Sequence, residues 1–386
     1  MKIVIAPQAF KGTLSAGRAA DAMVEAALGV FPAADVVRCP VADGGDGTLD
    51  ALVEATGGAY HTVQTTGPLG EPCSARWGSL GDGRTAVVET AQACGLALLP
   101  AGVRDPMGAT THGVGAVIRA VLDAGHRRII LGIGGSATND GGAGLAVALG
   151  MRLLRADGGG IANGGAALLE LDRIDASGLD ARLREAELVI ASDVTNVLCG
   201  PAGAAAAFGP QKGATPEDVA MLDRALGQMA DAARRDLGVD VSGIAGGGAA
   251  GGMGAGMVAF LGARIAWGAD IVAEAVGLDA RLDRATLAVT GEGRLDWQTA
   301  YHKAPAVVAN RASARGIPVL GVGGSLGPGW RKLYTEGFTA LAGMAAGAVS
   351  VEDAMASPYE HLVRATVRGL RAVRGRVPFA LRFPSG

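Results

Sequence analysis

The sequence contains few cysteines and no excess of positive charge. Its four cysteines, Cys39, Cys73, Cys94 and Cys199, are scattered, and no two of them form a CxxC pair. This spacing argues against a structural zinc site and against a disulfide framework, so we expect reduced thiols and a cytoplasmic protein. The formal net charge is −3 and no cluster of lysine or arginine is present, which argues against a nucleic-acid partner.

Long hydrophobic segments and the common kinase signatures are also absent. Glycine or a charged residue interrupts each apolar stretch before it reaches membrane-spanning length, and the run at residues 1–6 is too short for a signal peptide. We therefore expect no membrane partner. No segment matches GxxxxGK[ST], and no protein-kinase glycine loop with a downstream HRD motif occurs, so any kinase here belongs to another class.

Glycine, by contrast, is abundant. The chain has 63 glycines in 386 residues, about twice the usual share, without a collagen period. Since 49% of the residues are apolar, we expect a sizeable core, and the glycines indicate many close backbone approaches. The length favours two domains or one large one.

One stretch, residues 129–144, has the pattern of a strand, a glycine loop and a helix. An apolar run enters the loop GGSATNDGG, and a helix-compatible segment follows it. In this arrangement backbone N–H groups and a helix N-terminus converge on an anion. The stretch predicts a phosphate site, with an ordinary strand-to-helix turn as the alternative. The residues expected to contact phosphate are Gly134, Gly135, Ser136, Thr138 and Asn139.

Further polar residues follow predicted strands at residues 2–6, 35–41, 188–191 and 287–290, and another strand is predicted at residues 318–322. Ligands of open α/β sheets bind at the carboxyl ends of the strands, so these positions are candidate site residues. Each also has a structural alternative as a turn residue, a solvated lysine or a member of an ion pair. In chain order they are Lys11, Asp43, Asp46, Asp193, Asn196, Glu292, Arg294 and Asp296, and Lys212 in the loop FGPQKGA joins them.

The alternation of strand and helix changes in one part of the chain. Short alternating runs at residues 62–66, 74–79 and 85–89 are typical of antiparallel strands with hairpin turns. A long amphipathic helix is expected at residues 216–237. We therefore predict the α/β class, with a doubly wound parallel sheet and an inserted second lobe of mixed α/β structure.

The candidate residues suit phosphoryl transfer from a nucleotide. Loops and cations hold the phosphates, Mg²⁺ bridges them, and a carboxylate orients or deprotonates the attacking hydroxyl. A nicotinamide-dependent dehydrogenase is one alternative, although no predicted strand leads into GxGxxG with an acidic residue about twenty positions on. A non-catalytic hydroxy-acid sensor is another, and it would leave the surplus of strand-end carboxylates poorly explained.

Several segments, in a fixed order, give the chain a family resemblance. They are IAPQAFKGTLSA, VADGGDGT, GIGGSATNDGGAG, SDVTN, FGPQKGA and TGEGRLD. Together they resemble the bacterial glycerate kinases of the glyoxylate and glucarate/galactarate pathways. The resemblance implies ATP- and Mg²⁺-dependent phosphorylation of D-glycerate, with 2-phosphoglycerate favoured and 3-phosphoglycerate the alternative product. It also implies a Rossmann-like domain from residues 1–62 and 286–386, an inserted α/β domain over residues 63–285, and an active-site cleft between the domains.

Roles follow from residue chemistry and from position within the family motifs. The loop at residues 134–142 and Lys212 would bind the nucleotide phosphates. Asp43 and Asp193 would activate the glycerate hydroxyl or, with Asp46, hold Mg²⁺, and Lys11 would join them in catalysis. The substrate-binding residues would be Arg294, Asp296, Glu292 and Asn196.

Some positions depart from the family pattern. Gln8 and Ala9 replace the acidic and hydroxyl residues of the usual APDSFKGS-like opening, so we place the essential carboxylates elsewhere. Asp46 stands where many relatives have glutamate, which keeps the charge. His112 stands where arginine is common, and it would hold a substrate carboxylate less strongly at pH 7. We expect a monomer or a homodimer.

Overall fold

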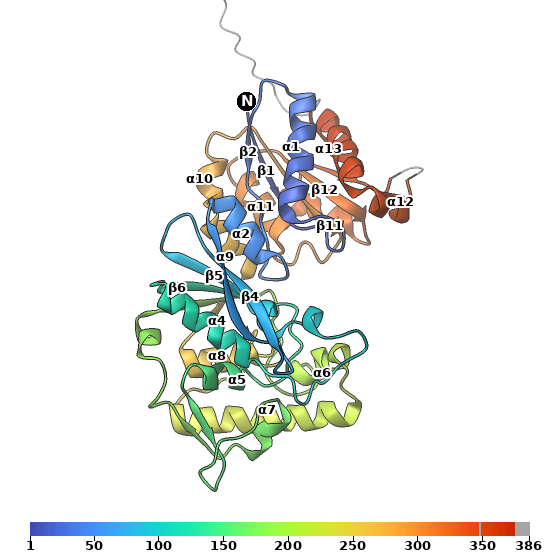
Figure 1. Cartoon of the computed structure of the whole chain (residues 1–386). Helices are drawn as coiled ribbons and strands as arrows, with labels where there is room; N and C mark the ends of the chain where they lie inside the picture. Colours follow the sequence, from blue (N-terminus) through green and yellow to red (C-terminus); the bar gives the residue numbers. More distant parts are fainter. Residues whose placement is uncertain (347–348, 375–386) are drawn as a thin grey trace, which may run out of the picture. The chain divides into compact units, whose positions relative to one another are not determined.

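The computed structural model describes residues 1–346 and 349–374, and the chain divides into two compact units. The first unit begins with residues 1–42 and resumes at residue 272, whereas the second consists of residues 43–271. Figure 1 therefore shows the first unit in the blue and orange-to-red colours of both chain ends. The predicted domain limits lie at residues 62/63 and 285/286, and the compact units change over at 42/43 and 271/272.

The first unit contains a five-stranded sheet in the order β13-β12-β11-β1-β2, and every neighbouring pair is parallel. Buried strand residues such as Ile3, Ile5 and Val289 form a core with α1 and α13, which lie side by side (Figure 1). The strands are β1 (Lys2–Pro7), β2 (Asp35–Arg38), β11 (Leu287–Leu295), β12 (Val319–Leu326) and β13 (Ala340–Gly343). The helices are α1 (Ala16–Val30), α10 (Leu278–Leu282), α11 (Ala304–Ser313), the 3₁₀ helix Trp330–Glu336, α12 (Val351–Ala356) and α13 (Pro358–Arg374).

The second unit contains a six-stranded mixed sheet in the order β10-β9-β6-β5-β4-β3. Strands β10, β9, β6 and β5 pair in parallel, whereas β5, β4 and β3 pair antiparallel. The strands are β3 (Ala59–Thr66), β4 (Pro72–Ser79), β5 (Thr85–Glu89), β6 (Arg128–Gly132), β9 (Glu187–Ala191), β10 (Arg264–Ala266) and the separate pair β7 (Arg152–Leu154) and β8 (Arg173–Asp175). The helices are α2 (Thr48–Thr56), α3 (Ala91–Cys94), α4 (His112–Asp123), α5 (Ala143–Ala148), α6 (Ala204–Phe208), α7 (Pro216–Leu237), α8 (Met253–Leu261) and α9 (Gly268–Ala275), which continues into the first unit, and the 3₁₀ helices are Leu96–Leu98, Ala166–Glu170, Ala181–Glu185 and Pro210–Lys212.

Two sequence predictions about this unit are confirmed. The runs at residues 62–66, 74–79 and 85–89 belong to the antiparallel strands β3, β4 and β5. The predicted helix at residues 216–237 is α7, whose first turn is fixed by a capping box between Thr215 and Asp218. Local turn and cap chemistry therefore determines these elements.

Strands β11 and β12 extend further than the sequence predicts. We expect them to end at residues 290 and 322, where glycines begin, but they continue to Leu295 and Leu326. Their parallel pairing persists, with Glu292 beside Gly323 and Arg294 beside Ser325. Because each strand supplies backbone partners to the other, the glycines do not end them. Glu292 and Arg294 consequently lie within a strand rather than in a loop.

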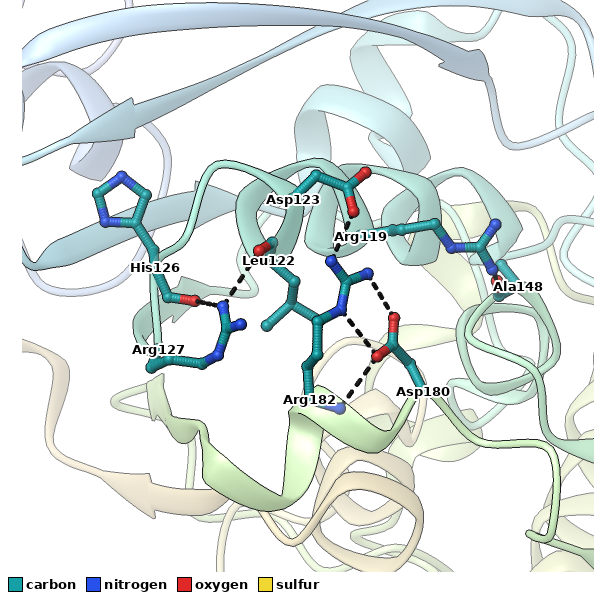
Figure 2. Close-up of polar contacts among 8 residues, drawn as sticks. All are labelled: Arg119, Leu122, Asp123, His126, Arg127, Ala148, Asp180 and Arg182. Carbon is teal, nitrogen blue, oxygen red and sulfur yellow. Dashed lines mark hydrogen bonds and ion pairs between the residues drawn. The ribbon is translucent and has the colours of Figure 1, made fainter.

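Polar contacts connect the C-terminal end of α4 with residues 126–127, which precede β6, and with residues 180–182 (Figure 2). Arg182 donates to Asp123 at 2.6 Å and to Asp180 at 2.7 Å. The Arg127 guanidinium donates to the carbonyl oxygens of Leu122 and His126 at 3.1 and 2.9 Å. These contacts hold the strand that leads into the glycine loop.

The fold is therefore mixed α/β, with a parallel sheet in one unit and a mixed sheet in the other, as the α/β class predicts. Within residues 1–346 and 349–374, no helix combines the length and the apolar character needed to span a membrane.

Candidate functional site

The segments that follow β6 and β9 lie at one edge of the second unit's sheet. Strands β5, β6 and β9 are parallel neighbours, with Glu89 beside Gly132 and Gly132 beside Ala191. Their carboxyl ends therefore share one edge, at which the segments at residues 133–142 and 192–196 emerge. The sequence predicts site residues in both segments, and the topology brings them to the same edge.

The loop at residues 44–47 packs directly on the glycine loop after β6. A Cβ on Gly134 would lie 2.9 Å from the Cα of Gly45, and one on Gly135 would lie 2.5 Å from Oδ1 of Asp46. Gly135 also has a φ of +73°, a conformation that glycine adopts at little cost. Glycine is required at both positions, and the close approach places Asp46 against the predicted phosphate loop.

Lys212 is buried against the same loop. Its ammonium group donates to Oγ of Ser136 at 3.1 Å and to the carbonyl oxygen of Thr138 at 2.6 Å, and the residue is 2% exposed. An ammonium group has three N–H donors, so these two bonds leave one for a ligand. Burial lowers the pKa of Lys212 to about 8, against the opposing influence of Cys94 and Asp140. A bound anion would favour the charged form of this lysine.

Asn139, in the same loop, has a fully buried carboxamide. Neither its nitrogen nor its oxygen has a hydrogen-bond partner among the residues that the structure describes. Buried polar groups are nearly always hydrogen-bonded, and an exception points to a bound water or ligand. Asn139 is therefore suited to contact a ligand, as the sequence predicts.

Asp140, the next residue, is instead occupied by the protein. Its carboxylate accepts from the backbone N–H groups of Thr111 and Gly144 at 2.8 and 3.2 Å and from the Thr111 hydroxyl at 2.8 Å. Burial raises the pKa of Asp140, and the bonds from Thr111, Gly142 and Gly144 oppose that rise. This carboxyl joins the starts of α4 and α5.

Asp43 and Asp193 meet around Gly268. Oδ1 of Asp193 accepts from the backbone N–H of Gly268 at 3.1 Å. A Cβ on Gly268 would lie 1.9 Å from the carbonyl oxygen of Asp43, so the two backbones are in close contact. Two acidic residues from different segments of the chain thus lie in one neighbourhood.

The Asp43 and Asp193 side chains are carboxylates, the ligand type that Mg²⁺ prefers. The described parts of the chain contain no group of three or more histidine, cysteine, aspartate or glutamate side chains arranged to hold a metal ion. Mg²⁺ is commonly bound by one or two carboxylates together with substrate phosphates and water. Asp43 and Asp193 fit that mode, in which the metal enters with the nucleotide.

Asn196, predicted to bind substrate, has a structural contact. Its amide nitrogen donates to the carbonyl oxygen of Ala202 at 2.7 Å, which closes the loop after β9. The amide oxygen can accept a hydrogen bond from a ligand. Asn196 belongs to the second unit, whereas the other three predicted substrate residues belong to the first.

Glu89 is a functional candidate that the sequence reasoning missed. It ends β5 and accepts a hydrogen bond from the backbone N–H of Gly47 at 2.7 Å. Burial raises the pKa of Glu89 to about 7, and the charges of Asp46 and Asp50 add to this effect. An acidic residue at the end of the strand predicted at residues 85–89 was the available signal.

In the first unit, Lys11 lies in the turn after β1. A Cβ on Gly293 would lie 3.5 Å from the backbone nitrogen of Lys11, so this turn packs on β11. The Lys11 side chain is exposed. A hollow of about 100 Å³ is lined in part by Lys11, Thr13, Gly293 and Ser325.

The structural alternative for Glu292, Arg294 and Asp296 is that they form ion pairs with each other, and this holds for Arg294 and Asp296, whereas Glu292 pairs instead with Lys303. Arg294 contacts Asp296 at 3.1 Å, and Glu292 contacts Lys303 at 3.8 Å. Oε1 of Glu292 also accepts from the Thr299 hydroxyl at 2.7 Å. The Arg294 side chain is 59% exposed, so it remains accessible to an anionic ligand. Thr299 and Lys303 join this group only through the fold, since they lie beyond the motif TGEGRLD.

The residues that depart from the family pattern lie in different units. Gln8 is buried at the end of β1, and its backbone N–H donates to the carbonyl oxygen of Gly291 at 2.8 Å. His112 begins α4 in the second unit, beside the start of α5. Gln8 therefore places a neutral side chain at the end of β1.

Comparison with known proteins gives a consistent result. The family model described as "Glycerate kinase family" matches residues 3–374. A glycerate kinase of Bacillus subtilis (strain 168) is 49% identical over 96% of this chain and 97% of its own length. A glycerate 2-kinase of Escherichia coli (strain K12) is 45% identical over 95% of this chain and 96% of its own length.

Among solved structures, a similar one comes from Salmonella typhimurium LT2, where the protein is assigned as a glycerate kinase 2. Its TM-score is 0.88 at 47% identity, over 97% of this chain and 99% of that one. The mixed α/β architecture is thus shared with that protein.

Proposed function

The chain belongs to the glycerate kinase family, and we propose that it transfers the terminal phosphoryl group of ATP to D-glycerate in the presence of Mg²⁺. The kinase assignment follows from the family. ATP is the phosphate donor that a kinase family implies. The name of the Escherichia coli relative, glycerate 2-kinase, supports 2-phosphoglycerate as the product.

The observation that carries the proposal is the buried cation of Lys212, which packs against the glycine loop. Lys212 holds its charge between Ser136 and Thr138 at a strand end, where loop N–H groups can also reach an anion. Placing an ammonium group in an apolar interior is unfavourable unless a negative charge compensates it. Nucleotide phosphates bound by Gly134, Gly135 and the Asn139 carboxamide would supply that charge.

We assign two roles to Asp43 and Asp193, which are to hold Mg²⁺ and to accept the proton of the attacking hydroxyl. If Mg²⁺ binds here, Asp43 and Asp193 would hold it, and it would offset the negative charge that develops during transfer. The hydroxyl oxygen of D-glycerate attacks the terminal phosphorus, the bond to the β-phosphate oxygen breaks, and ADP leaves. One of the two carboxylates orients the hydroxyl and accepts its proton, and Asp46 supports the same region from the 44–47 loop.

Lys11 and Arg294 are assigned to the anionic groups of the substrates. Lys11 stabilises the transferring phosphoryl group, and Arg294 binds the carboxylate of D-glycerate, with Asp296 fixing the guanidinium. Glu292 and the amide oxygen of Asn196 accept hydrogen bonds from the substrate hydroxyls. In this proposal the reaction uses groups from both units, as the sequence predicts.

We further propose that the first unit is Rossmann-like and that the protein is cytoplasmic. The strand order β13-β12-β11-β1-β2 supports the first proposal, because the direction of strand addition reverses between β1 and β11. The four cysteines are free thiols, which is typical of a reducing compartment and supports the second.

A ³¹P NMR product assay tests the proposed activity. ATP, Mg²⁺ and D-glycerate are incubated with the protein, and tartronate and glycerol serve as control acceptors. We expect a phosphomonoester with D-glycerate alone, and its coupling to carbon-bound protons distinguishes the 2-phosphate from the 3-phosphate. Binding of both substrates without a phosphoester would contradict the proposal and favour a hydroxy-acid sensor.

A further inference from the structure

Glu89 occupies a position that the proposed mechanism does not use. It ends β5 and lies beside Gly132, the last residue of β6 before the glycine loop. Only 6% of its surface is exposed. A buried carboxyl at the carboxyl edge of a parallel sheet has to be explained by its contacts.

The contacts show that Glu89, a residue of β5, caps the N-terminus of helix α2. Helix α2 begins after Gly47, which has no side chain to satisfy the first amides of the helix. Oε1 of Glu89 accepts the Gly47 N–H at 2.7 Å, and the Leu49 N–H also bonds to this carboxyl. Two backbone donors of one loop are therefore satisfied by a residue that is about forty positions further along the chain.

The same loop carries Asp46 and packs on the predicted phosphate loop. The Cα of Gly45 faces Gly134, and Oδ1 of Asp46 faces Gly135. The 44–47 loop is thus bound on one side by Glu89 and on the other by the residues assigned to nucleotide phosphates. Any shift at Gly47 would move Asp46 relative to Gly135.

We propose that Glu89 is a positioning residue for phosphoryl transfer: its carboxylate holds the 44–47 loop in register with the phosphate-binding loop. The inference rests on the proposed function, because it takes the 134–139 segment as the nucleotide site. Glu89 touches neither substrate in this scheme, and it acts through the Gly47 amide and Asp46.

Ionisation of Glu89 matters because its carboxyl accepts hydrogen bonds from two backbone N–H groups, those of Gly47 and Leu49. A carboxylate accepts two N–H bonds, whereas a protonated carboxyl or a carboxamide turns a donor towards one of the amides. Burial, Asp46 and Asp50 raise the pKa of Glu89 to about 7, while the Gly47 and Leu49 amides lower it. The loop is consequently expected to be best ordered above neutral pH.

The test compares Glu89→Gln with Glu54→Gln, which removes an exposed carboxylate from the same helix. The steady-state kcat and the KM values for ATP and D-glycerate are measured from pH 5.5 to 8.5. We expect the wild type and Glu54→Gln to show kcat rising with pH through about 7. Glu89→Gln should lower kcat at pH 8 by at least tenfold and lose the rise.

A Glu89→Gln protein with wild-type kcat and an unchanged pH profile would refute the inference. Should Glu89→Gln fail to fold, Glu89→Asp serves as the second variant: it keeps the charge but shortens the reach, so kcat should fall while the rise with pH remains. If Glu89→Asp matches the wild type, the inference is likewise refuted.

Amide hydrogen exchange separates this inference from the proposed function. Residues 44–50 of Glu89→Gln should exchange faster than those of the wild type and of Glu54→Gln, whether or not the protein turns over. If the wild type makes no phosphoglycerate yet exchange accelerates, the activity proposal fails and the positioning contact stands. Unchanged exchange in an active enzyme would overturn the positioning role alone.

Discussion

At the level of single residues, Lys212 is expected to affect both the binding of ATP and the stability of the folded protein. Its buried charge is held by Ser136 and Thr138, and both contacts face the predicted nucleotide site. Asn139 differs from Lys212 in this respect, since its side-chain amide lacks a hydrogen-bond partner among the residues described. Functional residues are often those whose own environment does not fully satisfy them.

Replacing Lys212 should separate affinity from stability. Lys212→Met is expected to raise KM for ATP at least tenfold, because the cation that faces the phosphates is lost, while the exposed Lys332→Met leaves KM unchanged. The pKa of Lys212 is lowered from 10.5 to about 8, so the folded protein binds fewer protons than the unfolded chain between these values. Stability therefore rises with pH in this window.

Urea unfolding at pH 8 and pH 10.5 measures this effect. The wild type should gain up to about 3 kcal/mol relative to Lys212→Met between the two values, since a shift of one pKa unit corresponds to about 1.4 kcal/mol. Equal slopes of stability against pH in the two proteins would show that the lysine is not buried as described.

Asp193→Asn should reduce kcat by two orders of magnitude or more without unfolding the protein. The asparagine oxygen can still accept the Gly268 N–H, but it neither binds Mg²⁺ strongly nor accepts a proton. Thermal unfolding and steady-state kinetics measure the two effects. The exposed Asp231→Asn is the control, and near-normal turnover of Asp193→Asn would remove this residue from the mechanism.

The glycine loops and strands are the elements that shape the site. Helix α2 begins at a glycine and depends on Glu89 from β5, whereas α7 is capped by its own Thr215 and Asp218. The boundaries of α7 follow from local sequence for that reason. Strands β11 and β12 instead continue through glycines because each pairs with the other.

Gly135→Ala tests the contact between the two loops. The new Cβ would lie 2.5 Å from Asp46 in a backbone of φ +73°, so both strain and collision are expected. Gly238→Ala is the matched control, because its φ is +72° and nothing lies within 4 Å. Urea unfolding should show a loss of about 1 kcal/mol for the control and a distinctly larger loss, with weaker ATP binding, for Gly135→Ala. Equal losses would mean that the loops are not in contact.

At the scale of the whole molecule, the candidate residues divide between two units, each with its own sheet and core. The predicted phosphate loop, Lys212, Asp43 and Asp193 belong to the second unit, and Lys11 and Arg294 to the first. Family membership extends across both, over residues 3–374. The activity is therefore a property of the full chain.

Metal removal tests how Mg²⁺ enters. Chelation with EDTA should abolish turnover and excess Mg²⁺ should restore it, while the Tm of the ligand-free protein stays the same. The reason is that, in the proposed mechanism, Asp43 and Asp193 would supply two carboxylates, and phosphate and water would supply the remaining ligands. A fall in Tm on adding EDTA alone would indicate a resident metal instead.

The sequence by itself determined the α/β class, the antiparallel strands β3 to β5, helix α7 and the glycine loop, because periodicity, turns and caps are local properties. It also pointed to Ser136, Thr138 and Lys212 as residues of one function. Only the tertiary structure decided which of these side chains meet. Lys212 reaches Ser136 across 76 positions of sequence, and Glu89 reaches Gly47 across 42. Such contacts depend on strand order and on burial, which no local pattern records.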